Sequence, residues 1–205
     1  MNMKKRMLSI VLSGAMAVST AVSAGSFSAF AVAQCVAYSG SNVNDQDYVQ
    51  WSDTVKSYLT VCDNGNYMRV QSGAIKGKLL VEYYSSDFEP LSTKLIDNEL
   101  PIFGAFYDSG NNYYVLSGQE NPKQNDSLEV FRITKYDKNW NKIKSCGLYG
   151  ANTTVPFDAG SARMTHSGDH LLVRTCHEMY KSSDGNNHQA NVTIEVDMPS
   201  MTITD

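Results

Sequence analysis

The sequence predicts an all-β protein of about three repeats, each of four antiparallel strands, behind a secretory signal. Three observations predict it. The first 33 residues are basic and then apolar, with no acidic residue. From Ser57 onward, short runs of β-branched and aromatic residues alternate with turns rich in Gly, Asn, Asp and Ser. The order of these runs then recurs along the chain.

Residues 1–33 have the three parts of a secretory signal. Basic residues 4–6 precede an apolar stretch over residues 7–22, which is shorter than the roughly 20 apolar residues that a membrane-spanning helix needs. Small residues favour cleavage after Ala31 or Ala33, with Ala24 as a third site. We therefore expect a secreted, extracellular protein with no membrane attachment after cleavage.

The charge balance bears on the class of partner. The chain of 205 residues has 17 basic and 21 acidic side chains, and removing the first 33 residues removes three of the basic ones, which leaves a net charge of about −7. An acidic protein without a cluster of Lys and Arg is a poor candidate for binding a phosphate backbone. We expect no nucleic-acid partner. A hydrophobic content of 42% is too high for an intrinsically disordered chain.

Residues 34–56 form an N-terminal segment ahead of the repeats. Within and just beyond it, Asp47–Leu59 shows helical spacing, because Tyr48, Trp51, Val55 and Leu59 fall on one face. We expect a short helix there.

The strands of each repeat are expected in a fixed order of strand, turn, strand, loop, strand, turn, strand. The first copy (57–100) has strands at 57–62, 67–70, 78–84 and 91–96. The second copy (101–150) has strands at 104–107, 113–116, 129–136 and 140–146, with a polar loop at 118–126. The third copy (160–205) has strands at 162–166, 171–174, 191–196 and 201–205, with a polar loop at 182–188.

The first turn of each copy carries a glycine, and Gly65, Gly110 and Gly168 lie 45 and 58 residues apart. Four strands repeated at a period of about 40–50 residues are typical of β-propeller blades. A lone four-stranded sheet cannot bury both faces, so each copy is expected to stack on its neighbour. The alternative is a β-sandwich whose hairpins happen to be alike.

Two segments carry a resemblance to a known class of proteins: Gly-Asn-Asn-Tyr-Tyr-Val-Leu at 110–116 and Glu-Val-Phe-Arg-Ile-Thr-Lys-Tyr-Asp at 129–137. Residues 57–205 resemble the repeats of secreted bacterial β-propeller proteins in the broad kelch-like or quinoprotein-like sense, without the kelch double glycine or a Trp-Asp blade ending. The resemblance implies an architecture and not an activity. Propellers use about four to eight blades, so three copies suggest an N-terminal fragment of a larger propeller or association of chains that completes the ring.

A group of polar residues in the third copy is the candidate binding region, because ligands of propellers bind on the loops and at the channel mouth. Within it we select Arg174, His177, Asp184 and His188 as candidate binding residues. We assign no catalytic residue, since His177 and its neighbour Glu178 are consecutive on a strand and point to opposite faces.

We expect no metal site. All four histidines fall between His166 and His188. Although His166 and His170 flank a short turn, the spacing fits no recognised ligand motif.

Four cysteines remain after cleavage: Cys35, Cys62, Cys146 and Cys176. An even number of cysteines in an exported protein permits disulfides. Cys35 with Cys62 and Cys146 with Cys176 are the pairings considered, and buried free thiols are the alternative.

Aromatic residues supply a second feature of the repeats. We expect them to form the core between blades, with stacking on sugars as the alternative. They are Trp51, Tyr83, Tyr84, Tyr113, Tyr114 and Trp140.

The sequence has no Gly-x-Ser-x-Gly motif, Walker loop or dinucleotide fingerprint, so we expect no cofactor. The function expected is a secreted or cell-surface binding or scaffold module for an extracellular glycan or protein. The alternatives are an extracellular hydrolase or lyase with its site on the loops of the third repeat, and a truncated fragment of a larger propeller protein.

Overall fold

The computed structural model of the protein describes residues 54–158, 160 and 162–205. The expected signal peptide with its expected cleavage sites, and Cys35, lie outside these residues. In the described part of the chain there are thirteen strands and no helix, so no helix there is long and apolar enough to cross a membrane.

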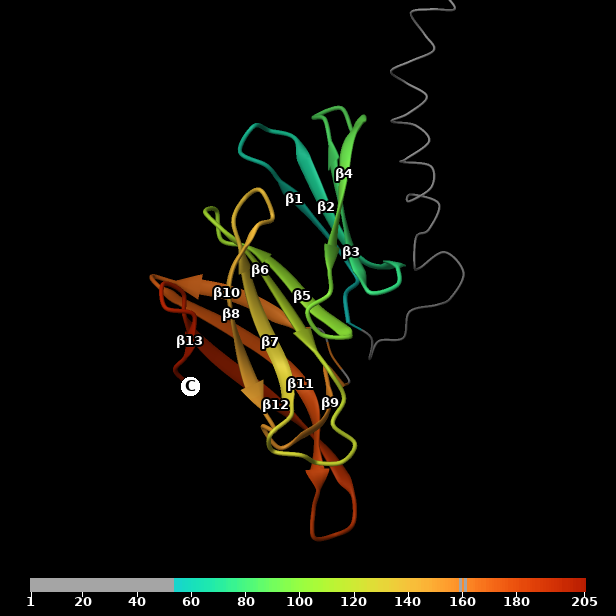
Figure 1. Cartoon of the computed structure of the whole chain (residues 1–205), viewed down its shortest axis with the longest axis vertical. Helices are drawn as coiled ribbons and strands as arrows, with labels where there is room; N and C mark the ends of the chain where they lie inside the picture. The colour runs from blue at the N-terminus through green and yellow to red at the C-terminus, as the bar shows by residue number, and fades with distance from the viewer. Residues whose placement is uncertain (1–53, 159, 161) are drawn as a thin grey trace, which may run out of the picture.

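The strands form three antiparallel sheets in chain order, which confirms the predicted four-stranded repeats (Figure 1). Sheet 1 contains β1 (Ser57–Val61), β2 (Tyr67–Ile75), β3 (Lys78–Tyr84) and β4 (Pro90–Asp97). Sheet 2 contains β5 (Ile102–Asp108), β6 (Tyr113–Gly118), β7 (Glu129–Tyr136) and β8 (Lys142–Tyr149). Sheet 3 contains β10 (Arg163–Ser167), β11 (His170–Lys181), β12 (Asn187–Asp197) and β13 (Thr202–Ile203), with β9 (Thr153–Pro156) also paired to β11.

Sheet 2 lies between the other two, so both of its faces are covered. One apolar cluster joins it to sheet 1 through residues such as Met68, Val81 and Val115. A second cluster joins it to sheet 3 through residues such as Leu116 and Val173. Every residue of β6 is buried as a result. Burial on alternate sides of one sheet is what a blade between two neighbouring blades requires.

Sheets 2 and 3 are stacked with equivalent strands together. The first strand of sheet 2, β5, contacts the first full strand of sheet 3, β10, and the last strands β8 and β13 also contact each other. Figure 1 shows sheet 1 in teal and green, sheet 2 in green and yellow and sheet 3 in orange and red, in succession. The arrangement is propeller-like, as the repeats predicted, and differs from a sandwich because three sheets stack in series.

Three expectations need correction. No strand was expected between the second and third copies, but β9 pairs with the end of β11 through His177 and Pro156. The helix predicted over Asp47–Leu59 is wrong at its C-terminal end, since Leu59 lies in β1 and pairs with Arg69. The helix expected there has no counterpart in residues 54–59, and residues 47–53 lie outside the described part of the chain. The strands β11 and β12 are also longer than predicted and form an extended hairpin.

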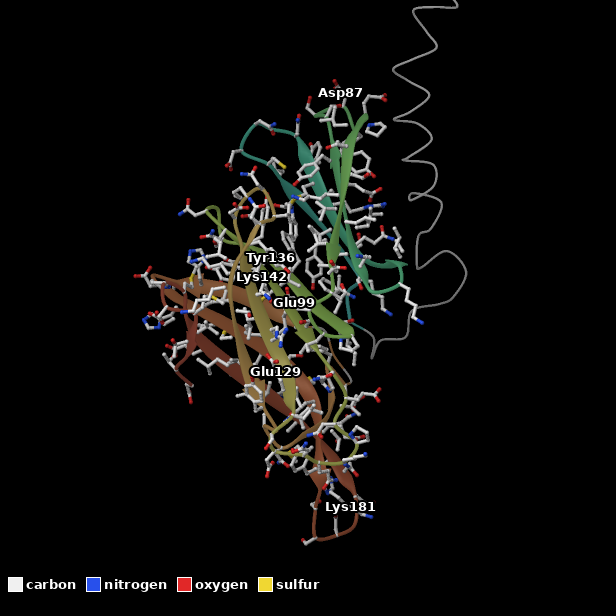
Figure 2. All side chains as sticks on the ribbon, viewed as in Figure 1. Asp87, Glu99, Glu129, Tyr136, Lys142 and Lys181 are labelled. Atoms are coloured by element: carbon white, nitrogen blue, oxygen red, sulfur yellow. The ribbon has the colours of Figure 1, made fainter. Side chains whose placement is uncertain are left out.

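Equivalent turns of the three sheets lie on one side of the molecule, the left in Figure 1. The three glycines of the first turns, Gly65, Gly110 and Gly168, all have positive φ, which other residues adopt at a cost. Along the long axis, Asp87 of the β3–β4 turn lies at one end and Lys181 of the β11–β12 hairpin at the other (Figure 2).

Candidate functional site

The four residues selected from the sequence do not form one site. Arg174 is exposed on the face of sheet 3 that points away from sheet 2, where its Nη1 donates to Thr193 Oγ1 at 2.6 Å. His177 is only 5% exposed, and its Nδ1 lies 2.6 Å from Thr153 Oγ1 of β9. Burial lowers the pKa of His177. These two side chains therefore face opposite sides of β11.

The other two selected residues, Asp184 and His188, do come together. They lie at the exposed tip of the β11–β12 hairpin, with His188 Nε2 2.8 Å from Asp184 Oδ2. The Asn186 backbone N–H, the Ser182 hydroxyl and His188 all donate to the Asp184 carboxylate, and they hold its pKa well below its usual range. The Asp184 carboxylate is therefore hydrogen-bonded entirely to groups of its own hairpin tip.

The histidines make separate contacts as well. His166 Nδ1 lies 2.8 Å from the Tyr107 hydroxyl, whereas His170 Nδ1 contacts Glu195 Oε1 at 2.7 Å. Among the described residues no three His, Cys, Asp or Glu side chains are grouped so that they could hold a metal ion.

Three of the cysteines fall in the described part of the chain. No disulfide joins Cys62, Cys146 and Cys176 to one another. Cys176 Sγ donates to Asn191 Oδ1 at 3.2 Å. A bridge between Cys35 and Cys62 stays a prediction, since Cys35 is not described.

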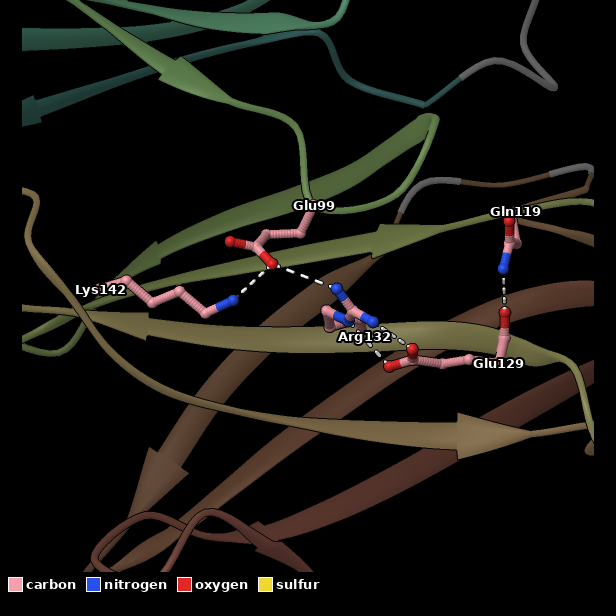
Figure 3. Close-up of polar contacts among 5 residues, drawn as sticks. All are labelled: Glu99, Gln119, Glu129, Arg132 and Lys142. Carbon is pink, nitrogen blue, oxygen red and sulfur yellow. Dashed lines mark hydrogen bonds and ion pairs between the residues drawn. The ribbon is translucent and has the colours of Figure 1, made fainter.

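A network of four charged side chains lies between sheet 2 and the β4–β5 loop (Figure 3). Arg132 Nε donates to Glu129 Oε1 at 2.9 Å, and Arg132 Nη1 lies 3.2 Å from Glu99 Oε2. Lys142 Nζ contacts the same Glu99 oxygen at 2.6 Å. Two carboxylates are thus matched by two cations. The hydrogen bonds that Arg132 donates to Glu129 are the main reason why the pKa of Arg132 is raised.

Two cavities open on the turn side of the molecule, one on each face of sheet 2. Cavity A, of about 300 Å³, lies between sheets 1 and 2. Cavity B, of about 320 Å³, lies between sheets 2 and 3. Cavity A is lined by Cys62, Asp63, Asn64, Asn66, Tyr83, Tyr113 and Lys138. Cavity B is lined by Ser109, Asn111, Asn112, Tyr114, Lys135, His166, Gly168, Asp169, Met198 and Pro199.

Cavity A has an aromatic floor and a polar rim. Lys138 Nζ lies 4.4 Å from the centre of the Tyr113 ring and 2.7 Å from Asp108 Oδ1, so this cation is paired on both sides. The Tyr83 hydroxyl accepts a hydrogen bond from Trp140 Nε1 at 3.1 Å, which fixes the second ring of the floor. The exposed Asp63 and the turn amides complete the rim.

Cavity B also has a lysine beside a tyrosine ring, but the two side chains make different contacts. Lys135 Nζ lies 6.0 Å from the centre of the Tyr114 ring and donates to the Met198 carbonyl at 3.0 Å. The Tyr114 hydroxyl is buried and has no hydrogen-bond partner among the described residues. Burial also raises the pKa of Tyr114 to about 12, so that the phenol stays protonated.

The sequence pointed to part of this arrangement. Tyr113 and Tyr114 stood in the segment that carried the propeller resemblance, and both are buried between sheets as expected. The two lysines were missed. Lys135 is in β7 and Lys138 is in the β7–β8 turn, and the spacing of three between two lysines on either side of the end of β7 was the available signal.

No family model matches the chain, and no curated protein matches it. Among solved structures it is similar to a mutant apocarotenoid oxygenase from Synechocystis, with 12% identity and a TM-score of 0.46. It is also similar to two GH43 β-1,3-galactosidases, one of them with galactodeoxynojirimycin, at 12% and 11% identity and TM-scores of 0.40. The matches cover 73%, 73% and 72% of this chain but only 37%, 44% and 35% of the solved chains. The chain therefore spans less than half the length of these proteins, and likeness at this level assigns no activity.

Proposed function

We propose that the protein is a secreted binding module that holds a neutral saccharide in cavity A. One observation carries the proposal: the cavity combines a fixed aromatic floor with a rim of one carboxylate and two amides. The C–H face of a sugar ring packs on aromatic rings, and its hydroxyls both donate to carboxylates and exchange hydrogen bonds with amides.

The charges of cavity A favour an uncharged ligand. Lys138 is already neutralised by Asp108, whose side chain is only 15% exposed. The carboxylate of Asp63 is left to accept hydrogen bonds from sugar hydroxyls. A cavity of about 300 Å³ has room for one or two sugar residues.

Binding accounts for the geometry better than glycoside hydrolysis. Hydrolysis ordinarily needs two carboxyl groups that flank the scissile bond. Among the described lining residues, Asp63 is the carboxylate of cavity A and Asp169 that of cavity B. Glu99 and Glu129, two carboxylates that both contact Arg132, lie outside both cavities.

The test is titration calorimetry of the protein without residues 1–33 against a panel of neutral oligosaccharides. Asp63→Ala is expected to weaken binding of the best ligand at least about tenfold, which is about 1.4 kcal/mol. Asp87→Ala is the control, because Asp87 is an exposed residue of the β3–β4 turn (Figure 2) and lines neither cavity. It should bind like the unaltered protein.

Circular dichroism and urea unfolding of both variants confirm that the fold is retained. The proposal is wrong if no neutral saccharide binds, or if Asp63→Ala and Asp87→Ala bind equally well. Release of new reducing ends from a bound polymer would point to the hydrolase alternative instead.

A further inference from the structure

Lys135 differs from its counterpart Lys138 in having no counter-ion. Lys138 forms an ion pair with Asp108, whereas Lys135 takes part in no ion pair within the described residues. Its Nζ donates to the carbonyl of Met198, which uses one of its three N–H bonds. In cavity B the ammonium group of Lys135 therefore has two N–H donors that can bind a ligand.

The buried hydroxyl of Tyr114 provides independent support for a ligand. Tyr114 lines cavity B and is fully buried, and no described residue forms a hydrogen bond with its hydroxyl. Leaving a buried polar group unpaired destabilises the folded protein. A ligand oxygen in cavity B would accept this hydrogen bond and recover that cost.

His166 adds a third donor. The Tyr107 hydroxyl lies 2.8 Å from His166 Nδ1, and with this hydroxyl as the donor the neutral ring carries its proton on Nε2. His166 lines cavity B, so Nε2 is available to a ligand there.

One acidic residue and two apolar ones limit what the ligand can be. Asp169 is exposed and lines the cavity from the β10–β11 turn, so it would repel a simple anion but accept hydroxyl groups. Met198 and Pro199 give one wall an apolar surface. A ligand that satisfies all of these groups needs a carboxylate, several hydroxyls and a C–H face in one molecule.

We infer that cavity B binds a uronic acid residue of an acidic saccharide. Its carboxylate accepts from Lys135 Nζ and the Tyr114 hydroxyl, and its hydroxyls meet Asp169 and His166. This inference rests on the proposed saccharide binding and extends it: the two faces of sheet 2 hold neighbouring sites of different charge preference.

The test compares a uronate-containing oligosaccharide with its carboxyl-reduced neutral counterpart by titration calorimetry. The unaltered protein should prefer the uronate form by at least about tenfold. Lys135→Met should remove the preference, while the neutral form still binds to cavity A. Lys144→Met is the matched control, because Lys144 Nζ also donates to a backbone carbonyl, that of Ser200, outside both cavities.

Tyr114→Phe separates binding from folding. The variant deletes only a hydroxyl that has no partner, so it should weaken uronate binding several-fold without lowering the free energy of unfolding. A loss of stability together with unchanged binding would contradict the role given to Tyr114.

Three further results would overturn the inference. These are equal binding of the uronate and neutral forms, equal behaviour of Lys135→Met and Lys144→Met, and binding of sodium acetate or an acidic peptide as tight as that of the uronate. In each case neutral saccharides can still bind to cavity A with the expected dependence on Asp63. Failure of every saccharide to bind would instead overturn the proposed function itself.

Discussion

Tyr113 and Tyr114 are consecutive residues of β6, yet their rings line two different cavities on opposite faces of sheet 2. Each ring has a lysine beside it, Lys138 at 4.4 Å from the Tyr113 centre and Lys135 at 6.0 Å from the Tyr114 centre. The alternation of side chains along a strand produces this division. A blade enclosed on both sides can therefore use one dipeptide to build two sites.

The junction between sheets 2 and 3 depends on the absence of a side chain at Gly104. A Cβ placed there would lie 2.4 Å from Cζ of Phe157, whose buried ring anchors the segment between β9 and β10. We expect Gly104→Ala to lower the free energy of unfolding by about 1–3 kcal/mol, because the core cannot accept the methyl group without moving the ring. Urea unfolding measures the change.

A double-mutant cycle with Phe157→Leu identifies the cause. If contact with the ring is responsible, Gly104→Ala should cost less in the Phe157→Leu background than in the unaltered protein. Equal costs in the two backgrounds would mean that the glycine is needed for another reason.

Arg132 holds together the charged network beside sheet 2. Arg132→Ala removes the group that contacts both Glu99 and Glu129. It leaves Glu99 with Lys142 alone and the poorly exposed carboxylate of Glu129 without a cation (Figure 3). We expect a loss of about 1–3 kcal/mol in the free energy of unfolding, less than for a fully buried pair because the arginine is 27% exposed.

Lys142→Met is the comparison for this variant. The Lys142 side chain is 43% exposed, so its loss should cost no more than about 1 kcal/mol in the same urea titration. A cost as large as that of Arg132→Ala would contradict the assignment of Arg132 as the central residue.

The sequence predicted the sheets well because their signals are local. A few neighbouring residues are enough to predict a strand, a turn or a positive-φ glycine such as Gly110. The strand β9 was missed because it is short, ends in Pro156 and is defined by pairing with a strand more than twenty residues later. Local patterns contain no information about such a partner.

The candidate site was harder to predict for the same reason. Arg174 and His177 are close in sequence, but a separation of three along a strand puts them on opposite faces. Cavity A brings together Asp63 and Lys138 from different sheets, and only the stacking of sheets makes them neighbours.

The thiols of the protein should differ in reactivity. Burial raises the pKa of Cys146 to about 11, so very little thiolate is present at pH 8. We expect iodoacetamide to label Cys146 only after unfolding, as read by peptide mass spectrometry. Rapid labelling in the folded protein would contradict this.

The same experiment tests the Cys35–Cys62 bridge predicted from the sequence. A disulfide would leave both residues unlabelled after unfolding without a reductant, and labelled once a reductant is added. Labelling of Cys62 without reductant would show a free thiol.

His177 should make the stability of the protein depend on pH. Burial lowers the pKa of His177 in the folded protein, so below the ordinary value of about 6.5 the unfolded chain binds a proton more readily than the folded one. The free energy of unfolding must then fall as the pH drops through the unfolded pKa, and the fall ends only below the depressed folded pKa. Urea titrations at pH 7.5, 6.5, 5.5 and 5.0 should show this loss.

His177→Gln is the control variant, because glutamine can still contact Thr153 but cannot take up the proton. The free energy of unfolding of this variant should therefore change less over that pH range. The contributions of the other titrating groups stay common to both proteins. Parallel curves for the two proteins would show that a different group controls the acid response.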